Sequence, residues 1–188
     1  MEAEELRFDR LWAENAGAVL RYAYQQVPRH EVDDVVAETF AVAWRRLDEV
    51  PDRALPWLLG VSRGVAANTR RAHRRRDALH LRVIRLPTAE VPDVADIVDA
   101  ELDEAAAAAL GRLSGRDREL LTLIAWEGLS PAEAADVVGC SPSALHVRLH
   151  RARARFRDLL LTADSHQHPP DATSVPDRSV IDSTGGAR

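Results

Sequence analysis

Hydrophobic positions recur along most of the chain with the period of an amphipathic helix. In the stretch "DDVVAETFAVAWRRL", Val36, Phe40, Ala43 and Leu47 fall at i, i+4, i+7 and i+11, so a helix places them on one face, with Trp44 beside them. No segment longer than a few residues alternates in the way that a half-buried strand requires. The pattern predicts an all-α protein.

Breaks in this pattern set the helix boundaries. We predict helices over residues 5–26, 33–47 and 57–76, separated by Val27-Pro28-Arg29 and by the turn between Pro51 and Pro56. Helical periodicity fades after residue 76, where Pro87 and Pro92 interrupt it, and returns from 101 to 113. Further helices are predicted over 116–128, 131–138 and 142–161.

This division predicts two small helical domains, residues 1–76 and 100–162, joined by a flexible linker over residues 77–99. Net charge changes sign along the chain: residues 63–85 carry 8 Arg and one acid, whereas residues 86–104 carry 7 acids and no Arg, so the linker is acidic. The last segment, residues 163–188, is polar and aperiodic and is predicted to be disordered. The four tryptophans, Trp12, Trp44, Trp57 and Trp126, lie in apolar patterns and are predicted to be core residues.

The second domain contains the pattern of a helix-turn-helix. Ser130-Pro131 and Ser141-Pro142 each pair an N-cap residue with a first-turn proline, and Gly139-Cys140-Ser141 forms the turn between them. A small side chain such as Cys140 suits a buried corner there; a redox switch is the alternative reading. In the second helix the apolar positions Leu145, Leu149, Ala152 and Phe156 are expected to face the core.

The opposite face of that helix is basic. The segment 141–157 contains no acid, whereas a merely solvated face usually mixes charges. Recognition helices meet base edges with their first turns, and later arginines bind phosphates. An antiparallel helix pair with a solvated charged face remains the alternative. The candidate DNA-binding residues of this helix are Ser143, Ala144, His146, Val147, Arg148, Arg151, Arg153 and Arg155.

A second basic surface lies on the predicted helix 57–76. On a helix, Asn68, Arg71 and Arg75 share one face, and Arg63, Arg70 and Arg74 share a neighbouring one. A flexible basic linker is the alternative interpretation. Two basic surfaces in two domains indicate a bipartite DNA site. The candidate residues of this surface are Arg63, Gly64, Ala67, Asn68, Arg70, Arg71, Arg74 and Arg75.

Composition excludes several other classes. The single cysteine excludes an internal disulfide and fits a reducing compartment, the N-terminus lacks the basic start of a signal peptide, and no stretch approaches the roughly 20 apolar residues of a membrane span. We therefore expect a cytoplasmic protein. His146 and His150 have a spacing that can bind zinc, but no third ligand lies nearby in sequence, so we expect no metal and no cofactor. No nucleophile–base pair, paired acids or phosphate loop appears, so we expect no enzyme.

The segments "VDDVVAETFAVAWRRL", "PWLLGVSRGVAANTRRAHRRR" and "ALGRLSGRDRELLTLIAWEGLSPAEAADVVGCSPSALHVRLHRARARF" together resemble the extracytoplasmic-function (ECF) type of bacterial sigma factor. The resemblance covers about residues 5–161. It implies a subunit that binds core RNA polymerase and directs promoter-specific initiation, with residues 1–76 as region 2 and residues 100–162 as region 4.

The resemblance also implies roles for particular segments. Residues 33–47 correspond to the helix that docks on the clamp helices of the β′ subunit, and region 4 adjoins the β flap. Residues 62–76 correspond to the reader of the melted −10 strand, the helix-turn-helix to the reader of the −35 duplex, and the linker to the segment threaded towards the polymerase active centre. An anti-sigma factor is a further candidate partner. The candidate docking residues are Asp34, Glu38, Thr39, Val42, Arg45 and Arg46.

Some positions depart from the family pattern. The family often has Gln at Ala37, Asn at Gly64 and Asp at Asn68, which leaves the −10 preference open. Ala144, His146 and Val147 replace commoner polar residues, so no −35 sequence is carried over. Two other functions stay open from the residues: a free-standing dimeric helix-turn-helix regulator, and an N-terminal domain that serves only as a protein-interaction module.

Overall fold

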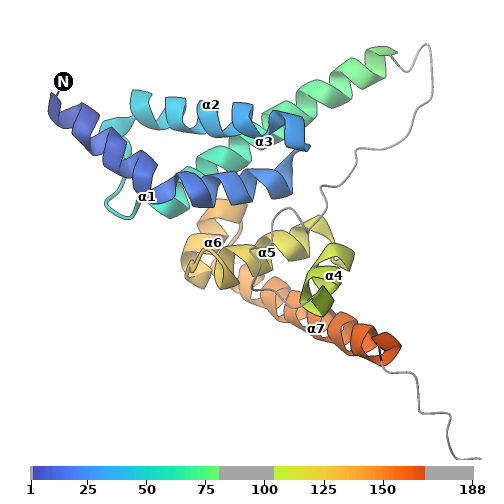
Figure 1. Cartoon of the computed structure of the whole chain (residues 1–188). Coiled ribbons are helices and arrows are strands. Elements are labelled where there is room, and N and C mark those ends of the chain that lie inside the picture. The colour runs from blue at the N-terminus through green and yellow to red at the C-terminus, as the bar shows by residue number, and fades with distance from the viewer. Residues whose placement is uncertain (1, 81–103, 168–188) are drawn as a thin grey trace, which may run out of the picture.

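The computed structural model describes residues 2–80 and 104–167, and every element of secondary structure in these ranges is helical. The N-terminal part contains α1 (Glu2–Gln26), η1 (Arg29–Glu31), α2 (Val32–Arg45), η2 (Leu47–Glu49) and α3 (Ala54–His80). The C-terminal part contains α4 (Glu104–Arg112), α5 (Gly115–Ala125), α6 (Pro131–Val138) and α7 (Pro142–Gln167). These elements confirm the prediction of an all-α fold in two helical parts (Figure 1).

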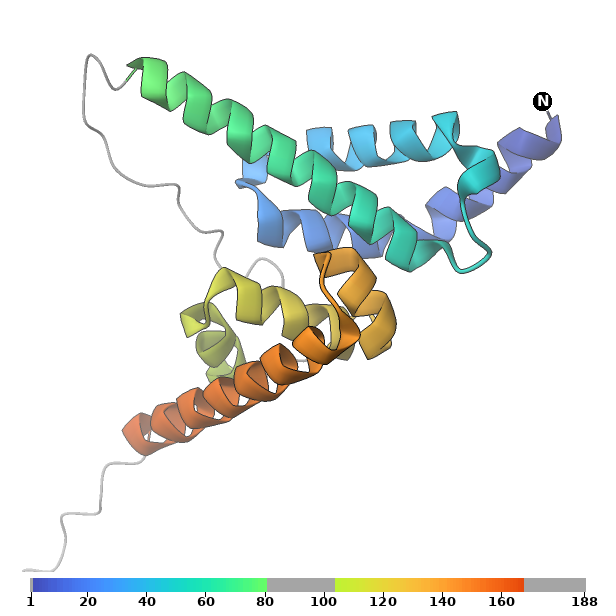
Figure 2. The same cartoon turned by 180° about the vertical axis from the view of Figure 1, so that it is seen from behind.

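The N-terminal part is a three-helix bundle. The predicted stripe on α2 is buried, with Phe40 2 % and Ala43 0 % exposed, because α1 and α3 pack against that face. Tyr22 of α1 and Leu58 of α3 are fully buried beside it. α3 is longer than its apolar beginning, so its C-terminal turns project past α1 and α2 (Figures 1 and 2). That projection leaves the basic half of α3 largely unpacked.

The C-terminal part is built around α7. α4 and α5 pack on its middle through a small core that includes Leu110, Leu121, Leu149 and Ala152. The first turn of α7 packs instead against α6 through Leu145, which is 0 % exposed. The predicted core positions of the recognition helix are therefore confirmed, with Phe156 partly buried at the edge.

The two parts pack directly on each other. α6 lies against α3 (Figures 1 and 2), and one continuous cluster of buried residues joins the bundle to the C-terminal part. The members from the C-terminal part that extend this cluster are Leu120, Leu123, Leu129, Ala134, Ala135, Val137 and Leu145. Besides being joined along the chain, the two predicted helical parts therefore contact each other directly, because apolar side chains on α5 and α6 extend the core of the N-terminal bundle.

Three further expectations change. Trp12 and Trp44 are 44 % and 45 % exposed, so they are not core residues; they flank Phe40 and Phe8 at the bundle surface instead. Trp57 and Trp126 are partly buried. α7 continues through residues 163–167, which were expected to be disordered, and α3 continues through residues 77–80 of the expected linker. The remaining linker and tail predictions fall on residues 81–99 and 168–188, outside the described ranges.

Candidate nucleic-acid interface

Two local features, a capping box and a left-handed glycine, stabilise the helix-turn-helix. At the start of α6, Ser130 Oγ accepts from the backbone N–H of Glu133, and the Glu133 carboxylate accepts from the backbone N–H of Ser130, which forms a capping box. At its end, Gly139 adopts φ +71°, and its N–H donates to Ala135. Glycine takes this left-handed conformation without strain, so the local sequence specifies the turn that ends α6.

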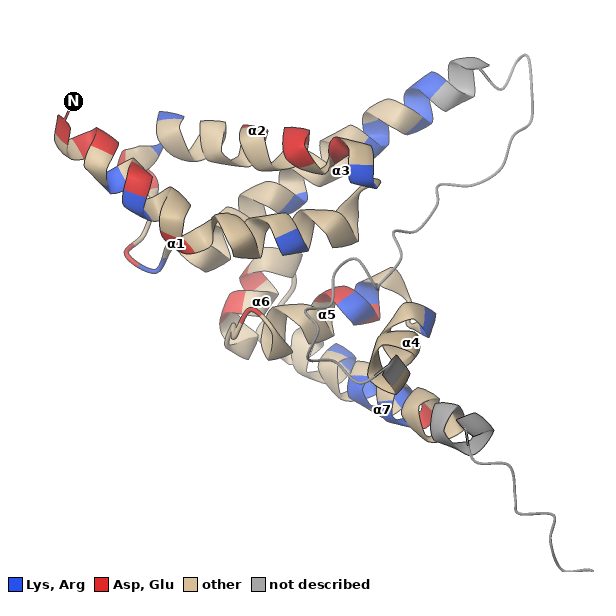
Figure 3. Cartoon of the chain, in the orientation of Figure 1, with Lys and Arg blue, Asp and Glu red and all other residues tan. Residues whose placement is uncertain are grey.

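This turn presents the predicted recognition residues to solvent. Ser143, His146, Val147 and Arg148 are exposed, and Ala144 is partly buried. The later arginines Arg151, Arg153 and Arg155 are exposed as well, and Figure 3 shows the basic residues along α7. Their placement satisfies the geometric requirement of a recognition helix, whose first turns enter the groove while the later turns follow the phosphates.

The basic surface of α3 divides into a free face and an engaged one. Asn68, Arg71 and Arg75 are exposed on the first face, where Arg71 donates to the Asn68 amide oxygen. Gly64 and Arg74 are exposed as well, and Ala67 is partly buried. Figure 3 shows this basic segment on the projecting part of α3.

Arg63 and Arg70, by contrast, are committed to intramolecular contacts. Arg70 Nη1 donates to the backbone oxygen of Gln26 at 2.6 Å and to its side-chain oxygen at 3.0 Å, which satisfies the C-terminal end of α1. Burial lowers the pKa of the Arg70 guanidinium from its usual value. Arg63 Nε donates to Glu119 of α5 at 2.9 Å. The sequence predicted their helix face correctly, but not that the rest of the protein covers it.

The predicted docking surface on α2 is partly available. Asp34 is exposed, and Glu38 and Arg45 form an exposed ion pair at 2.9 Å. Val42 is partly buried. Arg46 pairs with Glu49, and its guanidinium lies 5.6 Å from the centre of the Trp57 ring.

Thr39 is corrected. It is 0 % exposed, and its hydroxyl donates to the backbone oxygen of Val35 at 2.7 Å. The helical period places Thr39 next to the apolar stripe, and the packing of α2 against its neighbours buries it. Its hydroxyl is satisfied by its own helix, so the residue needs no partner and offers none.

Polar contacts between the two parts were not predicted. The buried Tyr22 hydroxyl donates to Glu119 Oε1 at 2.6 Å, the oxygen that Arg63 also contacts. Arg21 forms a two-point contact with Glu127, at 3.2 and 3.0 Å, and the Glu127 side chain is 1 % exposed. These contacts bring residues about 56 to 106 positions apart together, so no local period could have signalled them.

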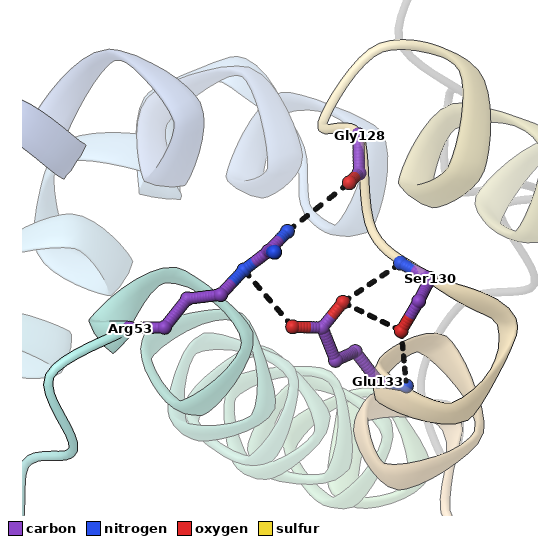
Figure 4. A network of polar contacts seen from close by, with 4 residues as sticks. All are labelled: Arg53, Gly128, Ser130 and Glu133. Carbon is purple, nitrogen blue, oxygen red and sulfur yellow. Dashed lines mark hydrogen bonds and ion pairs between the residues drawn. The ribbon is translucent and has the colours of Figure 1, made fainter.

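A third contact uses the capping box itself. Arg53 Nε lies 2.9 Å from Glu133 Oε1, and a terminal nitrogen of Arg53 donates to the backbone oxygen of Gly128 at 3.1 Å (Figure 4). Glu133 therefore caps α6 with one oxygen and binds the N-terminal part with the other. The hydrogen bonds from Ser130 and the nearby Arg53 lower the pKa of the Glu133 carboxyl.

Within residues 2–80 and 104–167, no group of three or more His, Cys, Asp or Glu residues is arranged to hold a metal ion. His146 and His150, the pair considered for zinc, are both exposed. None of the helices in these ranges combines the length and apolar character needed to cross a membrane.

Comparison with protein families gives two matches. Residues 11–76 match the family described as sigma-70 region 2, and residues 103–156 match the family described as sigma-70 region 4. The two matches contain α3 and the helix-turn-helix respectively, so both basic surfaces fall inside them. A free-standing helix-turn-helix regulator would account for the second match but not for the first.

Comparison with individual proteins supports the same family. The chain is 36 % identical over 151 residues to the RNA polymerase sigma factor CnrH of Cupriavidus metallidurans, covering 75 % of this chain and 78 % of that one. It is 31 % identical over 161 residues to the ECF RNA polymerase sigma factor SigL of Mycobacterium tuberculosis, covering 82 % and 89 %. Among solved structures, the sigma factor RpoE of Bartonella quintana, in complex with the anti-sigma factor NepR, matches with a TM-score of 0.64 and 26 % identity, over 82 % of this chain and 96 % of that one.

Proposed function

The chain belongs to the ECF type of RNA polymerase sigma factors and directs transcription initiation, and from this premise we propose how its described surfaces divide that task. The N-terminal part reads the melted −10 strand and docks on the polymerase, and the C-terminal part reads the −35 duplex. The observation that carries the proposal is the exposure of two separate basic helix faces, one in each matched region.

For the −35 element, the reading surface is the exposed side of α7. Its first two turns present short or apolar side chains that fit close to base edges, including the methyl group of thymine. Arg151, Arg153 and Arg155 follow and contribute phosphate contacts, which supply affinity without sequence information. Arg148, at the boundary, reads guanine or a phosphate.

For the −10 element, the reading surface is the free face of α3 with Asn68, Arg71 and Arg75. Single-stranded DNA is held by basic grooves together with groups that contact the bases. Arg63 and Arg70, which the sequence placed in the same set, take part only where their contacts with Glu119 and Gln26 are exchanged for contacts with DNA.

Core polymerase docks on α2. The available residues Asp34, Glu38, Val42, Arg45 and Arg46 form the docking set, against the β′ clamp helices, and region 4 contacts the β flap. Anti-sigma factors are further partners in this proposal, because the structures similar to this chain include the CnrH complex with the cytosolic domain of CnrY, at a TM-score of 0.53 and 32 % identity. The protein acts in the cytoplasm as a regulator and has no catalytic activity of its own.

The experiment that tests this assignment is reconstitution with core RNA polymerase and a promoter library. We expect co-elution with core and selective transcripts whose alignment gives the −10 and −35 sequences. No association with core, together with dimeric binding to duplex DNA alone, would contradict it.

A paired substitution tests the −10 face. Arg71→Gln with Arg75→Gln should reduce open-complex formation about tenfold or more, since each charge-assisted contact contributes roughly 1.5–3 kcal/mol, and should leave core binding unchanged. Permanganate reactivity of promoter thymines measures the opening. Arg10→Gln, another exposed arginine of the same part, is the matched control. Normal opening in the double variant would instead favour an N-terminal part used only for protein contacts.

A further inference from the structure

A cavity of about 430 Å³ lies where α3, α5 and α7 meet. Four arginines line it: Arg63 from α3, Arg116 from α5, and Arg148 and Arg155 from α7. Two acids, Asp117 and Glu119, line it as well. The cavity is therefore formed by both parts of the protein together, and positive charge exceeds negative charge on its wall.

Both acids are already satisfied within the protein. Glu119 accepts from Tyr22 and Arg63, and Asp117 accepts from the Ser114 hydroxyl at 2.9 Å and from Arg155 Nη1 at 2.7 Å. Each of these contacts uses one nitrogen of its arginine. Both terminal nitrogens of Arg63, and Nε and Nη2 of Arg155, keep their donor capacity.

Arg116 and Arg148 have still more hydrogen-bond donors available for a ligand. Both are exposed, and neither has a hydrogen-bond or ion-pair partner in the part of the chain that the structure describes. Four guanidinium groups thus direct an excess of donors into one concave site. A solvated surface arginine gains nothing from such convergence, because like charges held close together repel each other.

We propose that this cavity binds a small ligand that carries two or more adjacent phosphate groups. Guanidinium forks match phosphate oxygens in geometry and charge, and bind them in bidentate fashion. One phosphate would leave most of the donors unused, whereas adjacent phosphates engage arginines from all three helices. The volume lies within the range of roughly 300–1,000 Å³ that is typical of small-molecule sites.

Such a ligand would favour the packed arrangement of the two parts. Arg63 belongs to one part and the other three arginines to the other, so only the packed form presents the complete site, and a ligand stabilises the form that it binds. Arg63, Arg148 and Arg155 are also assigned above to promoter DNA. If that assignment holds, the ligand and the promoter compete for the same guanidinium groups.

Titration of the full-length protein with sodium tripolyphosphate tests the site directly. Calorimetry is performed without DNA or polymerase, with ionic strength held constant by chloride. We expect saturable one-site binding and a melting temperature that rises with tripolyphosphate. Absence of saturable binding would overturn the proposal and leave the proposed function untouched, because no step of promoter recognition enters this measurement.

Arg116→Gln is the decisive variant. Arg116 is exposed, has no hydrogen-bond or ion-pair partner within residues 2–80 and 104–167, and is not among the proposed DNA contacts, so its replacement should leave folding and ligand-free transcription intact. We expect tripolyphosphate affinity to fall about tenfold, as the loss of one charge-assisted hydrogen bond implies, and Arg116→Lys to bind with intermediate affinity. Arg112→Gln, an exposed arginine at the end of α4 and outside the cavity lining, is the matched control. Equal affinity in Arg116→Gln, or equal weakening in Arg112→Gln, would contradict the site.

Parallel titrations with GTP and ATP separate two sources of the same chemistry. Tighter binding of either nucleotide than of tripolyphosphate identifies a nucleoside polyphosphate, with the apolar Leu120 and Val138 on the cavity wall available to the base. Equal affinity for all three identifies an inorganic polyphosphate.

Discussion

Tyr22 shows how much a single side chain contributes to the union of the two parts. It is fully buried in the N-terminal bundle, and its hydroxyl reaches Glu119 of the C-terminal part. Burial, and then the neighbouring Glu119 carboxylate, raise the pKa of Tyr22 well above its ordinary value of 10.0. The folded protein therefore holds the phenolic proton more tightly than the unfolded chain does.

This shift makes stability depend on pH at the alkaline end. The contribution of Tyr22 is complete below pH 10.0, the ordinary value, and is lost as pH rises from there towards the raised pKa. We expect the free energy of unfolding to fall more steeply above about pH 10 in the wild type than in Tyr22→Phe. Urea denaturation at a series of alkaline pH values measures the slopes. Parallel curves for Tyr22→Phe and wild type would disprove the coupling.

Gly64 is a second residue with a specific consequence. It lies exposed within α3, and a methyl group added at its α-carbon would meet open space. Gly64→Ala should therefore raise the free energy of unfolding by about 1 kcal/mol, the helix-propensity difference between the two residues. Denaturant titration measures the gain. Gly128, with φ +62°, is the matched contrast: Gly128→Ala should destabilise, by roughly 1–2 kcal/mol, because alanine is strained in the left-handed region.

At the scale of elements, α6 depends on both its own cap and the other part of the protein. Ser130 and Glu133 close the capping box, and the same carboxylate binds Arg53 (Figure 4). A short helix of this length is not stable alone in water, so the cap and the packing on α3 must together hold the helix-turn-helix in shape.

Removal of the cap should therefore be measurable. Ser130→Ala is expected to cost about 1 kcal/mol at neutral pH, measured by thermal or urea unfolding. The cost should shrink as pH falls below 4.5, because the lowered pKa of Glu133 stabilises the folded state only above the ordinary carboxyl value and that contribution is lost under acid conditions. Ser143→Ala, one helix later and exposed, should be close to neutral, and an equal loss in the two variants would contradict the assigned cap.

At the scale of the whole molecule, three arginines of the N-terminal part each bind a glutamate of the C-terminal part: Arg21 with Glu127, Arg53 with Glu133 and Arg63 with Glu119. With the shared apolar cluster, these pairs hold together the two parts that carry the proposed DNA-reading surfaces. In the packed arrangement Arg63 Nε is bound to Glu119, so separation of the two parts releases that contact.

Weakening one of these Arg–Glu pairs should favour separation of the two parts. Glu119→Gln keeps the size of the side chain but removes the charge that holds Arg63, and leaves a buried contact weakened. We expect a larger radius of gyration in small-angle X-ray scattering, and an increase with salt in the wild type as ion pairs are screened. Asp158→Asn, an exposed acid of α7, should not change the radius. An unchanged radius in Glu119→Gln would show that the apolar cluster alone holds the parts together.

The local elements followed from the sequence. The period of 3.6 identified the helices, and Val36, Phe40, Leu145 and Leu149 were assigned to the core correctly because a helix face depends only on residues within a few turns. The bounds of α6 were predicted to the residue, since Ser130-Pro131 and Gly139 are start and stop signals with a local physical cause. The exposure of Ser143, His146, Val147 and Arg148, the proposed recognition residues of α7, followed from the same rule.

Only the tertiary structure decided which faces stay free. Thr39 lies beside the apolar stripe of α2 and Arg70 on a basic face of α3, yet neighbouring helices cover both, and Trp12 and Trp44 look apolar but lie at the edge of the bundle. The pairing of Arg63 with Glu119, and the arginine-lined cavity beside it, join residues from three helices far apart in the chain. Periodicity determines the face of a helix on which a residue lies, whereas what packs against that face is a property of the whole molecule.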